Sequence, residues 1–441
     1  MMPISLSPLQ VTRRAAVLAA VLWSGAVFGQ ASAPTLQVPA GPATPALQEK
    51  DVVGVCGDSI TEQKQYSVFI EDYLLMCQPA AGLRTFQAGW GGERAPGFLA
   101  RIGTDVLPLM PTVVTTCYGM NDGGYAPLTP EVAKAYREAT TGIVRNLKKA
   151  GVRVIVVGSP GVVDADTYRK SPQAAEMYNK TLAGLRDIVK EVATAEGVRF
   201  ADVYDPMMDV MTKCKAKYGA GYALAGGDGV HPGANGHLVM AYAYLKALGC
   251  DGNVGTITLD MAAGKAEATA GHKIISATPT SVEVESTRYP FCFTGDPKDP
   301  ASDRGPLEFL PFNEELNRFR LVVTNVTADA SYKVTWGTTT KTFSAGQLAK
   351  GINLAAEFLD NPFSEAFAKV DRAVHEQQNY ETPLTKVMLH DLPNFRAAAP
   401  EETGALAAKI IAKDKTLFDA SAGAVAPVRH TLKIEKIGAG A

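Results

Sequence analysis

The sequence lacks an excess of charge of either sign. It contains 43 lysines and arginines against 45 aspartates and glutamates, and its pI is near 6.3. A protein without a basic surface field has no means of holding a polyanion, so we do not expect nucleic acid as a partner. With 46% apolar and 20% charged residues, the composition is that of a globular protein rather than a disordered or fibrous one.

Long apolar runs are missing after the N-terminal segment. No later stretch of about 18 or more apolar residues occurs, so no membrane-spanning helix is predicted in the mature chain. Near the N-terminus, Arg13 and Arg14 precede a short apolar run and then small residues, the pattern of a cleaved export signal. We interpret residues 1–31 as a signal peptide and 32–50 as an Ala/Pro-rich linker. The protein is expected to be periplasmic or extracellular, and the paired arginines leave a folded-export route open.

Cysteines are few as well. Six of them in an exported chain permit disulfide bonds without requiring them. Cys56 and Cys117 lie in apolar runs, where a free thiol packs like a small apolar side chain. Cys214 and Cys250 lie near predicted helix ends and are the better candidates for a bridge, which geometry must decide.

The first half of the chain alternates apolar runs with amphipathic helical segments. The runs occupy residues 52–56, 84–88, 112–118, 152–158 and 198–203. Apolar strands that are separated by helices predict a mainly parallel, five-stranded sheet with helices on both faces, that is, an α/β domain. Since 441 residues exceed one ordinary core, we place this domain at 51–250 and expect further structure after it.

The second half has a different pattern. Its runs at 256–260, 272–277, 281–286, 318–326 and 331–337 alternate apolar and polar residues. This alternation predicts an antiparallel sheet with one wet face, so we expect a β-rich, sandwich-like domain over 251–345. Helical patterns return afterwards, and residues 346–441 are expected to form a helical C-terminal segment that ends in a loose tail.

Histidine is absent from residues 51–230, so His231 is the first imidazole available as a general base. It follows Asp228 in the segment DGVH. The predicted strands also end in polar, glycine-rich segments: GDSIT after the first, GWGGER after the second and GMNDGG after the third. The carboxyl ends of parallel strands meet at one edge of the sheet, where the working site of such folds lies. The polar groups are therefore expected to face one crevice.

These residue types suit acyl transfer. A serine hydroxyl becomes a good nucleophile when a base takes its proton, and a carboxylate improves that base by fixing its tautomer. Ser59, His231 and Asp228 supply the three roles. The tetrahedral intermediate needs donors aimed at its oxyanion. Gly89 suits a backbone donor, because glycine lets the main chain approach a substrate, and Asn121 suits a side-chain donor.

The four segments resemble the sequence blocks of the SGNH, or GDSL, hydrolase family: GDSIT, QAGWGG, GMND and DGVH. The resemblance implies a three-layer α/β/α sandwich of the flavodoxin-like SGNH type. It also implies that Ser59 is the nucleophile and first oxyanion donor, and that Gly89 and Asn121 are the second and third donors. Asp228 would be the orienting acid and His231 the base. Phrases in the second half resemble C-terminal extensions of secreted bacterial members.

One residue departs from the family pattern, and three others have alternative interpretations. Gln87 stands where the glycine block of the family usually begins with Asn. Ser59, taken alone, could be a helix N-cap. Asp58 is interpreted as a hydrogen-bonding loop residue rather than the acid of the triad. His237 could join His231 in a metal site, but it falls inside the apolar pattern of a helix, which favours a packed residue. We therefore expect neither a metal nor another cofactor.

Substrate contacts are expected from Trp90, Arg94 and Tyr118, which flank the glycine and asparagine blocks. The resulting hypothesis is a secreted serine esterase that works through an acyl-enzyme on short-acyl esters, such as acetyl groups on carbohydrate. Two alternatives stay open: a lipase-like or thioesterase-like hydrolase of longer acyl chains, and a carbohydrate-binding protein without catalytic activity on the same scaffold.

Overall fold

The computed structural model of the chain describes residues 46–437. The predicted signal peptide and most of the predicted linker lie outside these residues. Five parallel strands form the first sheet in the order β2-β1-β3-β4-β5. Their bounds are β1 Val52–Gly57, β2 Arg84–Gly89, β3 Val113–Cys117, β4 Val154–Gly158 and β5 Arg199–Ala201. The sequence-based prediction of a parallel five-stranded sheet is confirmed.

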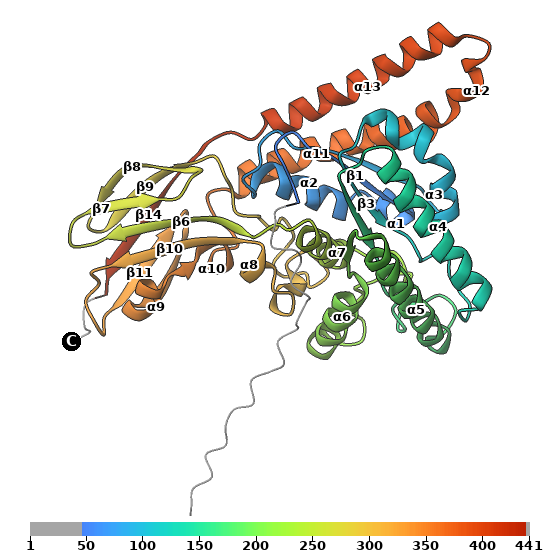
Figure 1. The fold of residues 1–441 in the computed structure, drawn as a ribbon. Coiled ribbons are helices and arrows are strands. Elements are labelled where there is room, and N and C mark those ends of the chain that lie inside the picture. The colour runs from blue at the N-terminus through green and yellow to red at the C-terminus, as the bar shows by residue number, and fades with distance from the viewer. Residues whose placement is uncertain (1–45, 438–441) are drawn as a thin grey trace, which may run out of the picture. The chain divides into compact units, whose positions relative to one another are not determined.

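Helices cover both faces of this sheet (Figure 1). They are α1 Ser59–Glu62, α2 Tyr66–Met76, α3 Ala95–Arg101, α4 Pro130–Lys149, α5 Pro172–Glu196, α6 Tyr204–Tyr218 and α7 Ala234–Ala247, with η1 Ile102–Val106 and η2 Leu107–Leu109 after α3. Apolar side chains of α3, α4 and the C-terminal part of α5 pack on one face of the sheet, and those of α2, α6 and α7 pack on the other. The domain is therefore a three-layer α/β/α sandwich, as predicted.

Local sequence sets the ends of the long helices. The Thr129 hydroxyl caps α4 by accepting a hydrogen bond from the Val132 N–H at 3.3 Å. Ser171 caps α5 in the same way. The chain leaves α5 at Gly197, whose φ of 62° lies in the left-handed region that favours glycine.

Two further sheets follow. The first has the order β13-β10-β6-β7 and the second β12-β11-β14-β9-β8. Their strands are β6 Asn253–Asp260, β7 Lys265–Ala268, β8 His272–Thr278, β9 Ser281–Ser286, β10 Arg318–Thr324, β11 Ser331–Trp336, β12 Thr339–Ser344, β13 Ile352–Asn353 and β14 Val428–Lys436. The ring of Phe319 in β10 lies 5.8 Å from that of Trp336 in β11, so the two sheets pack face to face as the predicted sandwich.

Two expectations for this half are wrong. β6 and β10 pair in parallel, whereas an antiparallel sheet was predicted; the long chain segment between them gives room for the crossover that parallel pairing needs. The tail was expected to be loose, but β14 is the central strand of its sheet and buries His430, Leu432 and Ile434. The strand was missed because its apolar alternation is short and directly follows an Ala/Gly-rich stretch.

The remaining helices lie between or after these strands, and two of them, α9 and α10, pack on β10. They are η3 Gly305–Glu308, α8 Phe312–Glu315, α9 Ala345–Lys350, α10 Leu354–Glu357, α11 Ser364–Pro383, η4 Leu384–Leu389, α12 Pro393–Arg396 and α13 Pro400–Gly423. α11 and α13 pack side by side, joined by a hydrogen bond of 3.0 Å from the Tyr380 hydroxyl to the Ile410 carbonyl (Figure 1). Among the described helices none is both long and apolar enough to cross a membrane.

The outer edge of β2 is covered by α11 rather than by another strand. Gln377 Nε2 donates to the Thr85 carbonyl at 3.0 Å, and the Gln87 N–H donates to Glu381 Oε2 at 2.8 Å. Side chains one helical turn apart thus replace the missing strand and satisfy its backbone groups. The C-terminal helix α11 therefore covers the outer edge of the first sheet.

All six cysteines are buried and free. The bridge for which Cys214 and Cys250 were the better candidates is not formed. Cys214 faces the apolar core from α6, and Cys250 lies beyond α7, so each packs as a small apolar side chain.

Buried carboxyl groups lie where α11 meets α2. The carboxyl group of Glu71 is fully buried and accepts hydrogen bonds from Gln377 at 2.9 Å and Gln378 at 2.8 Å. Burial raises the pKa of Glu71 to about 8, although these two bonds oppose the shift. Burial, together with the charge of Glu71, also raises the pKa of Glu381. Each group is therefore favoured in its neutral form within the fold.

Replacement of Glu71 by glutamine is expected to change how stability depends on pH. The folded protein keeps the Glu71 proton up to about pH 8, whereas the unfolded chain loses it near its ordinary pKa of 4.5. The stability that this group contributes is therefore complete below its pKa in the unfolded chain, and it is lost as pH rises through its pKa in the folded protein. The Glu71→Gln variant should therefore gain in Tm relative to the wild type as pH rises. Its Tm difference from the wild type should be several degrees more positive at about pH 9 than at about pH 5.

Thermal unfolding at the two pH values measures this difference. The exposed Glu138 supplies the control, and Glu138→Gln should shift Tm equally at both. An equal shift for Glu71→Gln at both pH values would show that its carboxyl group does not hold a proton in the folded protein.

Candidate functional site

Ser59 lies at a sharp turn between β1 and α1. Asp58 caps the helix, because its Oδ1 accepts a hydrogen bond of 2.9 Å from the Ile60 N–H. A Cβ atom built on Gly57 would lie 2.1 Å from Thr61 Oγ1, so only glycine fits at the end of the strand. The capping role that Ser59 could have played alone belongs to Asp58. The Ser59 side chain is left free to point away from the helix end.

The structure brings the three predicted triad residues together. Ser59 Oγ lies 2.8 Å from His231 Nε2, and His231 Nδ1 lies 2.8 Å from Asp228 Oδ2. A carboxylate at Nδ1 favours the tautomer that carries its proton there, which leaves Nε2 able to accept the serine proton. The arrangement therefore has the connectivity that an activated serine needs.

Asp228 is held as an anion. Its burial opposes ionisation, but backbone N–H groups of His231 and Val230, each 2.9 Å from Oδ1, and the imidazole of His231 lower its pKa below the usual value. A fixed charge at this position stabilises the imidazolium that forms when the serine loses its proton.

Arg169 is a neighbour that sequence reasoning missed. Its guanidinium lies 3.4 Å from Asp228 Oδ2, and its side chain is 80% exposed. The residue lies in the loop after β4, so the same rule about carboxyl ends of strands would have found it.

A cavity of about 230 Å³ opens beside the imidazole. It is lined by Tyr125, Tyr168, Arg169, Lys170, Asp228, Val230 and His231. The Tyr125 hydroxyl donates to Asn121 Oδ1 at 3.1 Å, which joins the cavity wall to the asparagine block. The cavity is small, and both aromatic rings and cations border it.

Asn121 Nδ2 already has two acceptors. It donates to the Glu93 carbonyl at 3.1 Å and to Asp58 Oδ2 at 3.4 Å, so the longer of these bonds has to give way before the amide can donate to an oxyanion. Burial raises the pKa of Asp58 to about 7 despite the hydrogen bond from Ile60, so this carboxyl group is partly neutral near physiological pH. The asparagine amide thus adjoins both the serine turn and the loop after β2.

The prediction for Gly89 is wrong. This residue is buried, and its N–H donates to Gln87 Oε1 at 2.9 Å, so it is not available to an oxyanion. A Cβ atom on Gly89 would lie 2.3 Å from the Glu62 nitrogen. Glycine is needed there so that β2 can pack against α1, not for approach to a substrate. Gln87, which departs from the family pattern, is the residue that occupies the Gly89 N–H.

Gly92 meets the requirements that Gly89 fails. It is exposed, has a φ of 72° and has open space around the place of a Cβ atom. Within the described residues its N–H has no hydrogen-bond partner. Its neighbour Glu93 accepts the Asn121 amide, so the two donors adjoin. The consecutive glycines in GWGGER were the sequence signal for this loop, but they did not show which N–H is free.

The three predicted substrate contacts differ in position. Tyr118 is 3% exposed and its hydroxyl donates to Glu93 Oε2 at 2.7 Å, so it belongs to the core and that prediction is wrong. Trp90 is half-buried, with its ring 4.8 Å from that of His390. Arg94 is exposed at the start of α3, and its role toward substrate stays a prediction.

His237 packs inside the domain. It is fully buried, its Nδ1 accepts from the Tyr66 N–H at 3.2 Å, and its ring stacks on that of Tyr66. Burial, with a smaller effect from His231, lowers its pKa to about 3. This agrees with the interpretation of a packed histidine. In the described part of the chain, no group of three or more His, Cys, Asp or Glu side chains could hold a metal ion.

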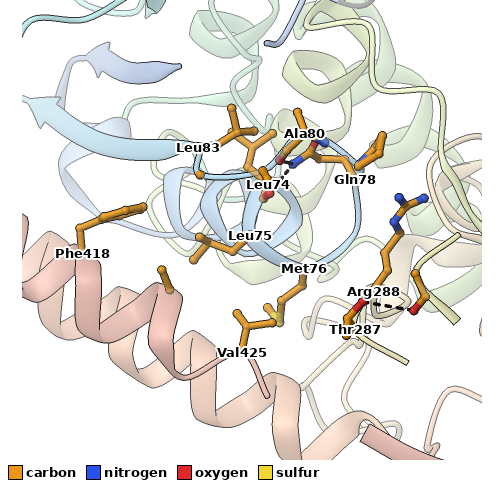
Figure 2. Close-up of a pocket in the computed structure, with 15 residues that line it drawn as sticks. Leu74, Leu75, Met76, Gln78, Ala80, Leu83, Thr287, Arg288, Phe418 and Val425 are labelled. Atoms are coloured by element: carbon orange, nitrogen blue, oxygen red, sulfur yellow. Dashed lines mark hydrogen bonds between the residues drawn. The ribbon is translucent and has the colours of Figure 1, made fainter. Parts of the chain in front are cut away.

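A larger cavity, of about 350 Å³, lies away from these groups (Figure 2). Its walls include Leu74, Leu75 and Met76 of α2, Phe418 of α13, and Thr287 and Arg288 after β9. The lining contains neither a histidine nor a carboxyl group, so nothing there could activate a nucleophile. The smaller cavity beside His231 is the candidate active site.

Fold and site together define an α/β/α hydrolase domain with a serine, histidine and aspartate in contact. Residues 55–239 match the GDSL-like lipase/acylhydrolase family. An acetylxylan esterase of Geobacillus stearothermophilus is 24% identical over 189 residues, which are 42% of this chain and 80% of that protein. A crystal structure of an acetylxylan esterase from the same organism has a TM-score of 0.38, with 22% identity over 46% of this chain and 95% of the other.

The likeness to one solved structure covers nearly the whole chain. The structure of a gut microbial diltiazem-metabolizing enzyme has a TM-score of 0.68 and 22% identity, over 90% of this chain and 99% of the other. The two proteins therefore share a fold that includes the second half. The family match over residues 55–239 and the esterase relative support the assignment of the protein as an ester-bond hydrolase.

Proposed function

We propose that this protein is an exported serine esterase that removes short acyl groups, above all acetyl, from carbohydrate. The observation that carries the proposal is the contact of Ser59 with His231 and of His231 with Asp228, each at 2.8 Å. Export rests on the signal-like N-terminal sequence, and the natural setting is then the periplasm or the extracellular medium.

In the proposed mechanism, Ser59 Oγ attacks the ester carbonyl carbon while His231 Nε2 takes its proton. The resulting oxyanion accepts hydrogen bonds from the N–H groups of Ser59 and Gly92 and from Asn121 Nδ2. The bond from carbon to the leaving oxygen then breaks, and His231 gives its proton to that oxygen, which leaves an acyl-Ser59. Water, deprotonated by His231, attacks the acyl group, and the acid is released as Ser59 regains its proton.

Two features support a short acyl group on a sugar. The cavity beside His231 measures about 230 Å³, which favours acetyl over long chains. The matched acetylxylan esterase is a protein that by its name acts on an acetylated carbohydrate.

The preference for acetyl groups is tested with 4-nitrophenyl esters and with acetylated polysaccharides. The purified protein should release acetate from an acetylated glycan, and kcat/KM should fall at least about tenfold from the acetyl to the octanoyl ester, because a small cavity favours the shorter acyl group. Faster cleavage of the octanoyl ester would instead favour a lipase-like enzyme. Binding of glycans without any ester cleavage would favour the carbohydrate-binding alternative.

A further inference from the structure

Residues 377–390, at the end of α11 and through η4, lie against the loop that follows β2. We refer to residues 87–93 as the glycine loop, since they hold Gly89, Gly91 and Gly92. The inference below rests on the proposed function, in which Gly92 of this loop donates to the oxyanion. It concerns residues of the second half of the chain, outside the segment that matches the hydrolase family.

The first set of contacts fixes Gln87 at the start of the glycine loop. Its N–H donates to Glu381 Oε2 at 2.8 Å, and its Nε2 donates to Thr382 Oγ1, also at 2.8 Å. The other end of the same amide, Oε1, accepts from the Gly89 N–H at 2.9 Å. The Gln87 side chain is thus bound on one side by α11 and on the other by the loop itself. The hydroxyl of Thr382 is the nearer of two acceptors of the amide nitrogen, and the Gln378 carbonyl is the other, at 3.4 Å.

The second set of contacts fixes the middle of the loop. Lys386 Nζ lies 2.6 Å from Glu62 Oε1, and each side chain is about one quarter exposed. Glu62 ends α1, the short helix that begins at Ser59. A Cβ atom on Gly91 would lie 2.8 Å from Glu62 Oε2, so this carboxylate rests against the loop. Lys386 also lies 5.1 Å from the centre of the Trp90 ring.

The third set of contacts surrounds Trp90 of the glycine loop. His390 lies 4.8 Å from the Trp90 ring, and its Nδ1 is 3.0 Å from Asp105 Oδ2. The Arg101 guanidinium lies 5.1 Å from the centre of the Trp90 ring and binds the Glu93 carboxylate at 2.7 Å. Trp90 is therefore held between the hydrolase domain and the C-terminal segment.

We propose that Thr382 and Lys386 are positioning residues, which hold the glycine loop so that the Gly92 N–H points at the oxyanion. Neither residue touches the reacting atoms in this proposal. Thr382 acts through Gln87, and Lys386 acts through Glu62. A displacement of the Gly92 N–H by about 1 Å can lower the rate on the order of a hundredfold. The C-terminal segment then contributes to catalysis although the triad lies entirely in the first half.

The test uses Thr382→Val and Lys386→Met in the full-length protein. Valine keeps the shape of threonine but cannot accept from Gln87, and methionine keeps most of the lysine chain without its charge. With 4-nitrophenyl acetate, kcat should fall about tenfold for each variant while KM changes less than about twofold, because the lost contact serves the transition state. The conservative variants Thr382→Ser and Lys386→Arg should restore most of the rate.

A boronic acid inhibitor supplies a second readout. It forms a tetrahedral adduct with the nucleophilic serine and places an oxygen where the oxyanion would lie, so its inhibition constant should rise about tenfold in both variants. Lys415→Met is the control: Lys415 pairs with Asp419 on the exposed side of α13, and this variant should keep the wild-type kcat and inhibition constant.

Unchanged kcat and boronate inhibition in Thr382→Val and Lys386→Met would overturn the proposal, even if Tm fell, because the contacts would then be structural only. An equal loss in Lys415→Met would overturn it as well. A failure of the proposed function would look different: Ser59→Ala would keep the wild-type rate, and the positioning proposal would fall with it.

Discussion

Replacement of Ser59 by alanine is expected to lower kcat for 4-nitrophenyl acetate at least about a thousandfold. The hydroxyl is the only group of this residue that can form the acyl-enzyme, and it lies 2.8 Å from His231 Nε2. The remaining activity would come from the oxyanion donors and from substrate binding. Initial rates of purified wild type and variant under saturating substrate measure the effect.

The control for this change is Ser276→Ala. Ser276 is exposed on β8 and its hydroxyl donates to Glu283 across the strand pair, so its replacement should leave kcat unchanged. Ser59→Ala should also keep the wild-type Tm within a few degrees, since Asp58 and not Ser59 caps α1. Cleavage by Ser59→Ala at more than about a tenth of the wild-type rate would contradict the proposed mechanism.

Removal of the Asn121 amide is expected to have the next largest effect. Asn121→Ala should lower kcat by about a hundredfold to a thousandfold, with little change in KM, because the amide donates to the oxyanion and not to the ground-state ester. Asn121→Asp is the matched variant: it keeps the size and the acceptor for the Tyr125 hydroxyl but loses the donor. It should be at least as slow as the alanine variant.

A second measurement separates oxyanion binding from damage to the triad. In both Asn121 variants, a phosphonate reagent should still label Ser59, although more slowly, because Ser59 and His231 stay in contact. If kcat remains within about threefold of the wild-type value, Asn121 does not serve as a donor. A rise in KM alone would assign it to substrate binding.

The first sheet could be predicted because its strands are apolar throughout and are separated by capped helices. Residues 52–56 and 112–118 needed no information beyond their own sequence. The triad could be proposed for a similar reason. Asp228 and His231 stand three positions apart in one segment, and a single rule about strand ends connects them with Ser59.

The choice of glycine in the loop after β2 could not be made from sequence. Gly89 and Gly92 are chemically identical, and what distinguishes them is that Gln87 Oε1 already occupies one N–H. Whether a backbone N–H is already hydrogen-bonded depends on the conformation of a nearby side chain, and residue type alone does not predict that conformation. Tyr118 shows the same limit, since its ring stacks on that of Phe98 in the core and its hydroxyl donates to Glu93.

The packing of the C-terminal helices against β2 also could not be predicted from local sequence patterns. The amphipathic pattern of α11 predicted a helix, but not which surface it covers. Gln87 and Glu381 are separated by most of the chain, and no short-range signal joins them. In the same way, the pairing of β14 with β9 and β11 could not be predicted, because both partners lie far from it in sequence.

The central claim is that Ser59 is the nucleophile of an esterase. The most direct measurement is mass spectrometry of the intact protein and its peptides after reaction with a fluorophosphonate, in parallel with loss of activity toward 4-nitrophenyl acetate. The account predicts one adduct per chain, on the peptide that contains Ser59, with inactivation in step with labelling and no adduct in Ser59→Ala. Labelling of another residue, or full labelling of Ser59 without loss of activity, would contradict it.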